Sequence, residues 1–427
     1  MIALCRLCVL LLVVIGLTGA TTAVQYVVTD LGTFGERYYT PNDINNSGQV
    51  VGYSSLYTGG GDWHGFLYSD GGMTDLGPGI AYGVNDIGQV VGSSSTTTNG
   101  GFLYTGGAMY SLGTLGGSYS YPAGINNGGQ IVGSASTTGD TGGHAFLYSD
   151  GTMKDLGTLG ADASGAYRIN SGGEVAGSIG IANPYSGGDS FAFLYSDGAM
   201  HNLGTLGGTS SWARGINDSG RVVGYSHIAG DATSHPFLYS DGRMQDLGTL
   251  GDGGAALDIN DSGQVVGQFD VTGGGGHSHA FLYSDSTMVD LNSLLFAGSR
   301  WVLTRAEGIN DSGQIMAQGY VPATGQVSTF LLLTPAFAGD ANGDGKVTFW
   351  DYIVLEFNFG KTGKTWGDGD FNDDGVVNFR DYILLEGNFG KSIPEPTALS
   401  LLALGGFSML RLGKSRYKVG RCGVDPR

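Results

Sequence analysis

Seven in-phase copies of one sequence unit constrain the fold of this chain more than any other feature. A stretch like Asp-Leu-Gly begins at positions 30, 75, 111, 155, 202, 246 and 290, at spacings of 36 to 47 residues. A stretch like Gly-Ile-Asn and a stretch like Phe-Leu-Tyr also occur seven times each, in the same cyclic order. A period of this length indicates a repeat architecture in which neighbouring units share a core.

Each unit is predicted to form four short strands. After Ile216, the stretch 217–220 reads Asn-Asp-Ser-Gly, whose residues tolerate positive φ and therefore predict a tight hairpin turn onto 222–224. Residues 237–239 predict a third strand and 244–247 a fourth. The 80 glycines and the 14% of charged residues fit short strands and turns better than helices. Four strands in about 44 residues is the length of a β-propeller blade.

The two ends of the repeat array complement each other. The seventh unit ends at 330–333 without an Asp-Leu-Gly strand, whereas 25–31 form such a strand with no unit before it. If the N-terminal strand completes the last blade, seven blades close into a ring that has no open sheet edge. The alternative, an open solenoid, needs polar capping units at its ends. We therefore expect a mainly β fold, a seven-bladed β-propeller over 24–335.

The chain is predicted to be exported. Residues 1–23 have the layout of a secretory signal peptide, with Arg6, an apolar run over 8–17 and small residues before the predicted cleavage point. The three cysteines, at 5, 8 and 422, lie outside the predicted propeller, so its stability is not expected to come from disulfides. The net charge of -18 argues against a nucleic-acid partner, because a phosphate-binding surface needs an excess of Lys and Arg.

The repeated unit resembles a known family. Units of the form GIN-DSGQVVG-HAFLYSDG-DLGTLGG look like the HAF repeats of bacterial extracellular proteins, over residues 24–335. The resemblance implies an exported, repetitive protein and no particular activity. The second unit (GGFLYTGG), the fourth (SFAFLYSD) and the seventh depart from the pattern.

The repeated polar residues point to architecture rather than to catalysis. Four His residues occupy the same point of their units: His64, His144, His235 and His279. Because a ring keeps such positions apart, we expect each His to bond to backbone groups rather than to share a metal ion. A glycosidase needs two facing carboxylates, whereas the predicted ring has three Glu and most of its Asp fall in repeated turns. The sequence has no GxSxG, HExxH or Walker motif, so we predict no catalytic residue.

The units differ most between their second and third strands. With the first strand innermost, these loops and the connections between units share one rim of the ring. Loops on a rigid scaffold commonly meet ligands, and aromatic side chains there can stack on sugar rings. The rim candidates for binding a glycan or protein ligand are Tyr57, Trp63, Tyr185 and Trp212.

A duplicated segment follows the propeller. Residues 340–360 and 370–390 are identical at 14 of 21 positions, and each copy has Asp, Asn and Asp at loop positions 1, 3 and 5, Gly at 6 and Asp at 12. This is the spacing of an EF-hand-like calcium loop. The helix after each loop is expected to bury three apolar residues, Ile353, Leu355 and Phe359 in the first copy and Ile383, Leu385 and Phe389 in the second.

Residues 336–392 resemble a type I dockerin, the module that docks onto cohesins in polysaccharide-degrading systems. Carried over by position, the resemblance implies two Ca²⁺ ions, the first held by Asp340, Asn342, Asp344, Lys346 (backbone), Thr348 and Asp351, the second by Asp370, Asn372, Asp374, Val376 (backbone), Asn378 and Asp381. Partner recognition in the family lies at loop positions 10 and 11, here Phe349, Trp350, Phe379 and Arg380. Dockerins often have Ser or Thr there. We therefore expect a divergent cohesin-like domain, or the chain's own propeller, as the partner.

Residues 393–427 resemble the PEP-CTERM sorting signal that exosortases recognise. The resemblance is carried by Pro394-Glu395-Pro396, an apolar run over 398–410 and a basic end. An apolar run of this length is short for a stable membrane span, and the basic end favours the cytoplasmic side. The implied course is a transient membrane anchor, cleavage, and delivery to the cell surface or the extracellular matrix.

These features predict an exported, surface-sorted, non-catalytic binding or scaffold protein. Its propeller presents loops to a glycan or protein ligand, and its dockerin-like module binds calcium and a protein partner. Two alternatives stay open: a polysaccharide hydrolase or lyase built on the propeller, or an accessory subunit of one, and a purely structural matrix protein.

Overall fold

The computed structural model describes residues 24–392 apart from the segments 33–38, 56–62, 98–99, 140–141, 181–188, 274–275, 297–298, 323–328, 343–344 and 373–374. The predicted signal peptide and sorting signal, 1–23 and 393–427, lie outside the described residues. No helix within the described part has the length and hydrophobicity to cross a membrane.

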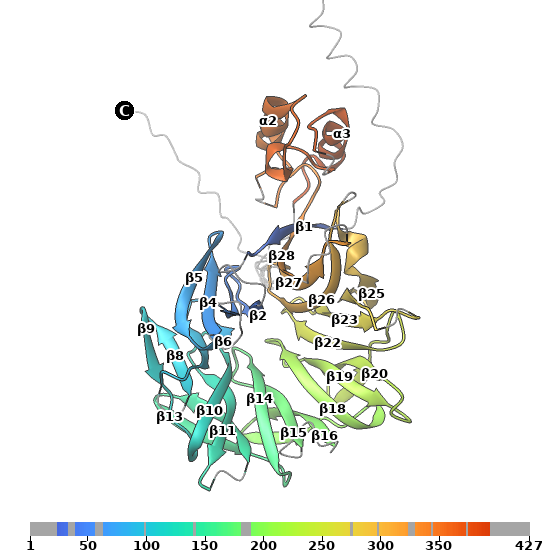
Figure 1. The fold of residues 1–427 in the computed structure, drawn as a ribbon. Helices are drawn as coiled ribbons and strands as arrows, with labels where there is room; N and C mark the ends of the chain where they lie inside the picture. The colour runs from blue at the N-terminus through green and yellow to red at the C-terminus, as the bar shows by residue number, and fades with distance from the viewer. Residues whose placement is uncertain are drawn as a thin grey trace, which may run out of the picture. The chain divides into compact units, whose positions relative to one another are not determined.

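Seven four-stranded antiparallel sheets form the blades of a propeller (Figure 1). The first, innermost strands are β2 (Tyr39–Ile44), β6 (Ile80–Val84), β10 (Gly116–Ile125), β14 (Ala163–Ile169), β18 (Gly207–Ile216), β22 (Gly254–Ile259) and β26 (Val302–Ile309). The second strands are β3 (Val50–Ser55), β7 (Val90–Ser93), β11 (Ile131–Thr137), β15 (Val175–Gly180), β19 (Val222–Ile228), β23 (Val265–Asp270) and β27 (Ile315–Tyr320). The third strands are β4 (Trp63–Ser69), β8 (Gly101–Thr105), β12 (Gly143–Ser149), β16 (Ser190–Ser196), β20 (Ser234–Ser240), β24 (Ser278–Ser284) and β28 (Thr329–Ala336). The outermost strands are β5 (Gly72–Pro78), β9 (Ala108–Ser111), β13 (Thr152–Gly157), β17 (Ala199–Asn202), β21 (Arg243–Asp246), β25 (Thr287–Asp290) and β1 (Gln25–Asp30).

The ring is closed by the N-terminal strand, as the sequence predicted. β1 pairs antiparallel with β28, from Gln25 opposite Ala336 to Asp30 opposite Leu331, and serves as the outermost strand of the seventh blade (Figure 1). Each innermost strand also contacts the innermost strand of the next blade, and β26 contacts β2. The buried side chain of Tyr26 packs into the core of the last blade. The propeller therefore depends on pairing between the two ends of the array.

Each blade is built around the Phe of its Phe-Leu-Tyr stretch. In six blades this ring is fully buried: Phe66, Phe102, Phe146, Phe193, Phe237 and Phe281. The second strand passes it with a glycine, and at Gly133 an added Cβ would lie 2.9 Å from Phe146 and 2.1 Å from the carbonyl oxygen of Tyr121. Close packing inside the blade thus requires glycine at this point of the second strand.

A closed cycle of asparagine side chains joins the blades at the axis. The Asn of each Gly-Ile-Asn stretch ends or follows an innermost strand, and we call these seven residues the Asn belt: Asn45, Asn85, Asn126, Asn170, Asn217, Asn260 and Asn310. Each Nδ2 donates to the backbone oxygen of the belt residue in the next blade, at 2.9–3.1 Å, and Asn310 closes the cycle onto Asn45. Each Oδ1 accepts from the backbone N–H four residues later, inside its own turn.

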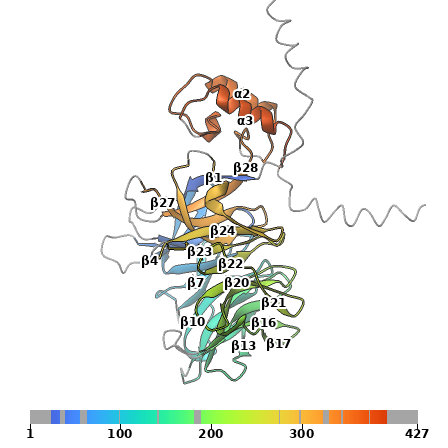
Figure 2. The ribbon, with the colours of Figure 1, turned by 90° about the vertical axis from the view of Figure 1, so that its right-hand side faces the viewer.

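The segment after the propeller folds around two short helices. α2 (Phe349–Asn358) and α3 (Phe379–Asn388) lie side by side, and the 3-10 turn η3 (Trp366–Asp368) lies between them in sequence (Figure 2). A further 3-10 turn, η1 (Leu291–Leu294), follows β25 in the propeller. The expected burial of Leu355 and Leu385 is confirmed.

The expected burial of four other residues, in or directly after these helices, is wrong. Ile353 and Phe359, like their counterparts Ile383 and Phe389, are between 41% and 56% exposed. In α2 the buried residues are Asp351, Leu355 and Asn358, spaced by four and three. That spacing is one helix face, and the other apolar residues lie off it.

Deletion of residues 24–32 tests the closure. Loss of β1 removes the partner of β28 and exposes a sheet edge, so we expect the variant to unfold at lower temperature or to oligomerise. Thermal melting and mass measurement by light scattering read this out, and a synthetic peptide of residues 24–32 added in trans serves as the control that restores the edge. An unchanged melting curve with a monomeric mass would contradict closure by β1.

Replacement of one belt residue tests the Asn belt. Asn126→Ala leaves the buried backbone oxygen of Asn170 and the N–H of Gln130 without their side-chain partner, so we expect a loss of about 2–4 kcal/mol in the free energy of unfolding. The matched control is Asn127→Ala. The exposed Asn127 side chain makes two bonds, both to Asp86, and its loss should cost under about 1 kcal/mol because water replaces them. Urea unfolding compares the two, and equal losses would refute the belt's role.

Candidate functional site

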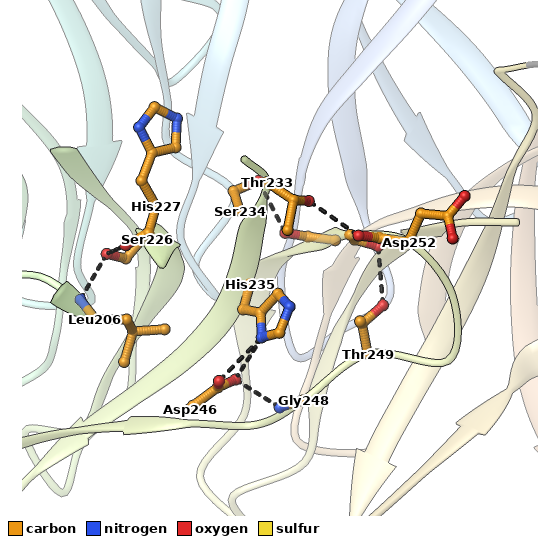
Figure 3. Close-up of polar contacts among 12 residues, drawn as sticks. Leu206, Ser226, His227, Thr233, Ser234, His235, Asp246, Gly248, Thr249 and Asp252 are labelled. Atoms are coloured by element: carbon orange, nitrogen blue, oxygen red, sulfur yellow. Dashed lines mark hydrogen bonds and ion pairs between the residues drawn. The ribbon is translucent and has the colours of Figure 1, made fainter. Parts of the chain in front are cut away.

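The repeated His residues pair with Asp residues of their own blades. In each pair a carboxylate oxygen of the Asp lies 2.8–2.9 Å from Nδ1 of the His. The pairs are His64 with Asp75, His144 with Asp155, His235 with Asp246, and His279 with Asp290. Figure 3 shows this arrangement in the fifth blade, where Asp246 also accepts from the N–H of Gly248.

The expectation that these His residues bond to backbone groups is therefore wrong, because their partners are Asp side chains. The outermost strand runs antiparallel to the third strand and sets the Asp of the Asp-Leu-Gly stretch opposite the Phe that follows the His by two residues. The Asp carboxylate then lies within hydrogen-bond distance of the His Nδ1. Each pair ties two strands of one blade, and the four pairs stay in separate blades. Within the described residues, no three His, Cys, Asp or Glu side chains gather as a metal site.

The structure describes two of the four predicted rim aromatics. Trp63 lies edge-on to Tyr53, with ring centroids 5.0 Å apart. Trp212 is on the innermost strand β18 and stacks on Tyr225, also at 5.0 Å. Tyr57 and Tyr185 lie outside the described residues.

A cavity of about 610 Å³ opens at the loop end of the blades. It lies where first strands begin, second strands end and third strands begin, with Trp212 on its wall. Its other aromatic lining residues, which sequence reasoning missed, are Tyr82, Tyr119, Tyr121 and Tyr167. We call this space the rim cavity. Its walls carry the flat apolar rings that stack on sugars, beside small residues such as Gly165 that leave room.

A second cavity, of about 420 Å³, lies along the axis of the ring. It is lined by the residue three positions before each belt Asn, which we call the channel position: Asn42, Tyr82, Ala123, Tyr167, Arg214, Leu257 and Glu307. Six residue types occupy the seven channel positions, although the flanking sequence repeats. That variation is the sequence signal that could have located the channel.

Three charged residues meet deeper on the axis, at the position two before the belt Asn. Arg168 lies 3.4 Å from Asp43 and donates to the backbone oxygen of Asn42 at 3.1 Å. Asp258 accepts from the N–H of Ile309 at 3.0 Å. The other four units have Gly at this position, which leaves the space that Arg168 and the two carboxylates occupy.

Burial dominates the electrostatics of this cluster. It raises the pKa of Asp258 to about 6, although the positive charge of Arg168 acts in the opposite direction. Burial also raises the pKa of Asp43, again against the effect of Arg168. Both carboxylates are therefore costly to ionise in the folded chain.

The two EF-hand-like loops have the same hydrogen-bond pattern. In the first, Asp351 is fully buried and accepts from the N–H groups of Ala341 at 2.9 Å and Thr348 at 2.7 Å. Asp340 is also buried and accepts from the N–H of Gly345 at 2.8 Å. Asp370 and Asp381 repeat these bonds in the second loop.

The described part of each loop fits a hard cation. Two buried carboxylates in one short loop are costly without a positive charge, and every described side-chain ligand of the predicted set offers oxygen, as Ca²⁺ requires. Thr348 and Asn378 also cap α2 and α3, by accepting from the N–H of Trp350 and of Arg380. Asp344 and Asp374 lie outside the described residues.

The predicted partner-binding residues form an exposed aromatic face. Phe349, Trp350 and Phe379 are 59%, 71% and 63% exposed, and Arg380 is exposed as well. The face continues across both helices, because the rings of Tyr352 and Tyr382 lie 6.2 Å apart. Contiguous exposed apolar surface is common at protein interaction sites.

The axial cluster predicts a pH dependence. The folded chain holds the proton of Asp258 more tightly than the unfolded chain, whose carboxyl has a pKa of about 4, so this group's contribution to the free energy of unfolding falls as the pH rises from about 4 to about 6. The Asp258→Asn variant has no carboxyl to titrate at this position. Its free energy of unfolding, relative to that of the wild type, should therefore rise by roughly 3 kcal/mol between about pH 4 and about pH 6. Denaturant unfolding at a series of pH values measures the gap, which is the difference in the free energy of unfolding between variant and wild type. Asp241→Asn, in an exposed turn, is the control. A gap independent of pH would contradict the assignment.

Comparisons with known proteins leave the activity of the chain open. No curated protein shows significant similarity to the chain. Among solved structures, the β-propeller domain of the Trilobed protease from Pyrococcus furiosus matches with 9% identity and a TM-score of 0.48, covering 69% of this chain and 95% of that one. The gluconolactonase XC5397 from Xanthomonas campestris matches with 11% identity and a TM-score of 0.37, covering 74% and 93%. TolB from Acinetobacter baumannii matches with 14% identity and a TM-score of 0.36, covering 52% and 62%. Residues 202–354, which span the later blades of the seven-bladed propeller and the start of the helical segment, match the DUF3466 family, described as a protein of unknown function.

Proposed function

We propose that this chain is a non-catalytic, exported binding protein whose propeller holds a glycan in the rim cavity. The observation that carries the proposal is the set of aromatic rings, among them Trp212, around a cavity of about 610 Å³. This volume lies within the usual range of small-molecule sites, about 300–1,000 Å³. Aromatic faces beside polar edges suit sugar rings, which are apolar on one face and carry hydroxyls at their edges.

The enzyme alternative rests on the axial carboxylates Asp43 and Asp258. A glycosidase needs one carboxyl with a raised pKa beside a second carboxylate, and Asp258 has such a pKa. Both carboxylates, however, already accept backbone N–H groups, of Val84 and of Ile309. This engagement favours a structural role for the pair, and therefore the binding function.

The helical module is proposed to bind two calcium ions and a protein partner. Asp340, Asp351, Asp370 and Asp381 would be ligands, together with the remaining predicted residues of the two loops. Calcium would offset the repulsion among these carboxylates and thereby stabilise the module. The exposed aromatic face around Phe349 and Phe379 would take the partner, either a cohesin-like domain or the propeller of this chain.

The proposed setting is the cell surface or the extracellular matrix. It rests on the predicted signal peptide and on the resemblance of 393–427 to a sorting signal processed by an exosortase. A scaffold that holds matrix glycan through its propeller and a second protein through its helical module would suit that setting. A purely structural matrix protein would leave the rim cavity without a ligand.

A glycan array followed by calorimetry on the full chain tests the binding function. We expect oligosaccharide binding that Trp212→Ala weakens about tenfold or more, since loss of a buried aromatic contact costs about 1.5–3 kcal/mol. The matched control is Trp63→Ala, a tryptophan outside the lining of the rim cavity. Reducing-sugar release from a bound glycan would support the enzyme alternative, and failure to bind any glycan would leave the structural role.

Titration of the chelator-treated full chain with calcium tests the module. We expect two ions to bind, and Asp351→Ala or Asp381→Ala to reduce the number to one, because each removes a buried carboxylate from one loop. Magnesium should substitute poorly, since it demands a smaller octahedral site. Asp368→Asn, outside both loops, is the control. Fewer than two ions bound by the wild-type chain would refute the dockerin resemblance as a guide.

A further inference from the structure

The rim cavity and the channel cavity share part of their walls. Tyr82, Ala123 and Tyr167 line both. A ligand that stacks on the aromatic wall of the rim cavity therefore lies beside the groups that line the channel. The side chains of the channel therefore indicate which chemical group the ligand presents toward the channel cavity.

The channel cavity gathers positive charge in an acidic protein. The structure describes seven Lys and Arg residues in the propeller, and three of them, Arg168, Arg214 and Arg305, line this one cavity. The chain as a whole has a net charge of -18. The arginines therefore mark the channel as the place where an anion is least repelled.

Two of the three arginines have an acidic partner close by. Arg168 lies 3.4 Å from Asp43, and Arg305 lies 2.7 Å from Glu307. Among the described residues, Arg214 makes no ion pair with Asp or Glu. Arg214 is thus the arginine whose charge is left for a ligand.

Arg214 is held in place by aromatic groups rather than by a carboxylate. Its guanidinium lies 5.5 Å from the ring centroids of Tyr167 and of Tyr225, and Nη2 donates to the Tyr225 hydroxyl at 3.1 Å. Its Nε is buried and has no hydrogen-bond partner within the described structure. A buried donor without a partner is costly, so the protein itself leaves this guanidinium incompletely satisfied.

We propose that the ligand of the rim cavity is an acidic oligosaccharide, a uronate whose carboxylate binds Arg214. The proposal rests on the glycan-binding function proposed above and names the chemical class of that ligand. Tyr167 connects the two parts, because it lines both cavities and lies against Arg214. A planar guanidinium fixed between rings matches a planar carboxylate in two parallel hydrogen bonds, which the spherical ammonium of Lys cannot reproduce.

Calorimetry of the full chain with matched probes tests the inference. The probes are short oligogalacturonates, their methyl esters, and an array of glucuronate, mannuronate and guluronate oligomers beside neutral oligosaccharides. We expect a uronate to bind and its methyl ester to bind about ten- to hundredfold more weakly. Added salt should weaken the acid more than the ester, since it screens the charge pair.

Variants separate the carboxylate contact from a general effect on the fold. Arg214→Gln should weaken the acid about ten- to hundredfold and leave the ester nearly unchanged, and Arg214→Lys should restore only part of the loss. Thermal melting of both variants checks that the fold is intact. Equal losses for acid and ester would overturn the assignment to Arg214.

The failure of this inference is distinct from the failure of the binding function. Neutral oligosaccharides that bind as well as uronates, with a loss on Trp212→Ala, would overturn the acidic ligand and leave glycan binding intact. No binding by any uronate or neutral probe would overturn both.

Discussion

The rest of the propeller depends on a cycle of side-chain hydrogen bonds at its axis. Each belt Asn holds its own hairpin turn and the backbone of the next blade at once, and the seventh bond returns to the first. Such a bond is buried from water, so leaving any one unmade costs more than a surface bond. The cycle therefore requires Asn in every unit, and it fixes the inner ends of all seven blades relative to one another.

This constraint at one end leaves the sequence free at the other. Between the belt and the loop end, the innermost strand has a small residue at most positions two before the Asn and a variable residue at the channel position. Tyr167, Arg214 and Glu307 occupy equivalent places in three blades, and no shared turn or pairing dictates their type. Diversity at equivalent places on a fixed frame is how a repeat protein builds an asymmetric site from a symmetric scaffold.

The local sequence pattern was enough to predict the strands and turns. The sites could not be predicted from it, because they form only when separate blades come together in the ring. The turn after Ile216, the strand of Phe237 and the closure by residues 25–31 follow from turn chemistry, from the hydrophobic pattern and from the unmatched ends of the array. The partner of His235 was misassigned because it depends on how the outermost strand lies against the third. The exposure of Ile353 was missed because a ten-residue helix buries only one face. The cavities could not be predicted in the same way, since Tyr82, Tyr167 and Arg214 come from separate units and meet only around the axis.

The pairing of Gln25 with Ala336 also sets an order of events during synthesis. Because a chain is made from its N-terminus, the first strand of the propeller emerges before every blade and its partner emerges after six of them. The nascent protein can complete six sheets while the strand that contains Tyr26 is still unpaired. Contacts between such distant segments form late and slowly, because the entropy of closing a long loop must be overcome first. Ring completion is therefore a last step, and until then two hydrophobic strand edges are open to neighbouring chains.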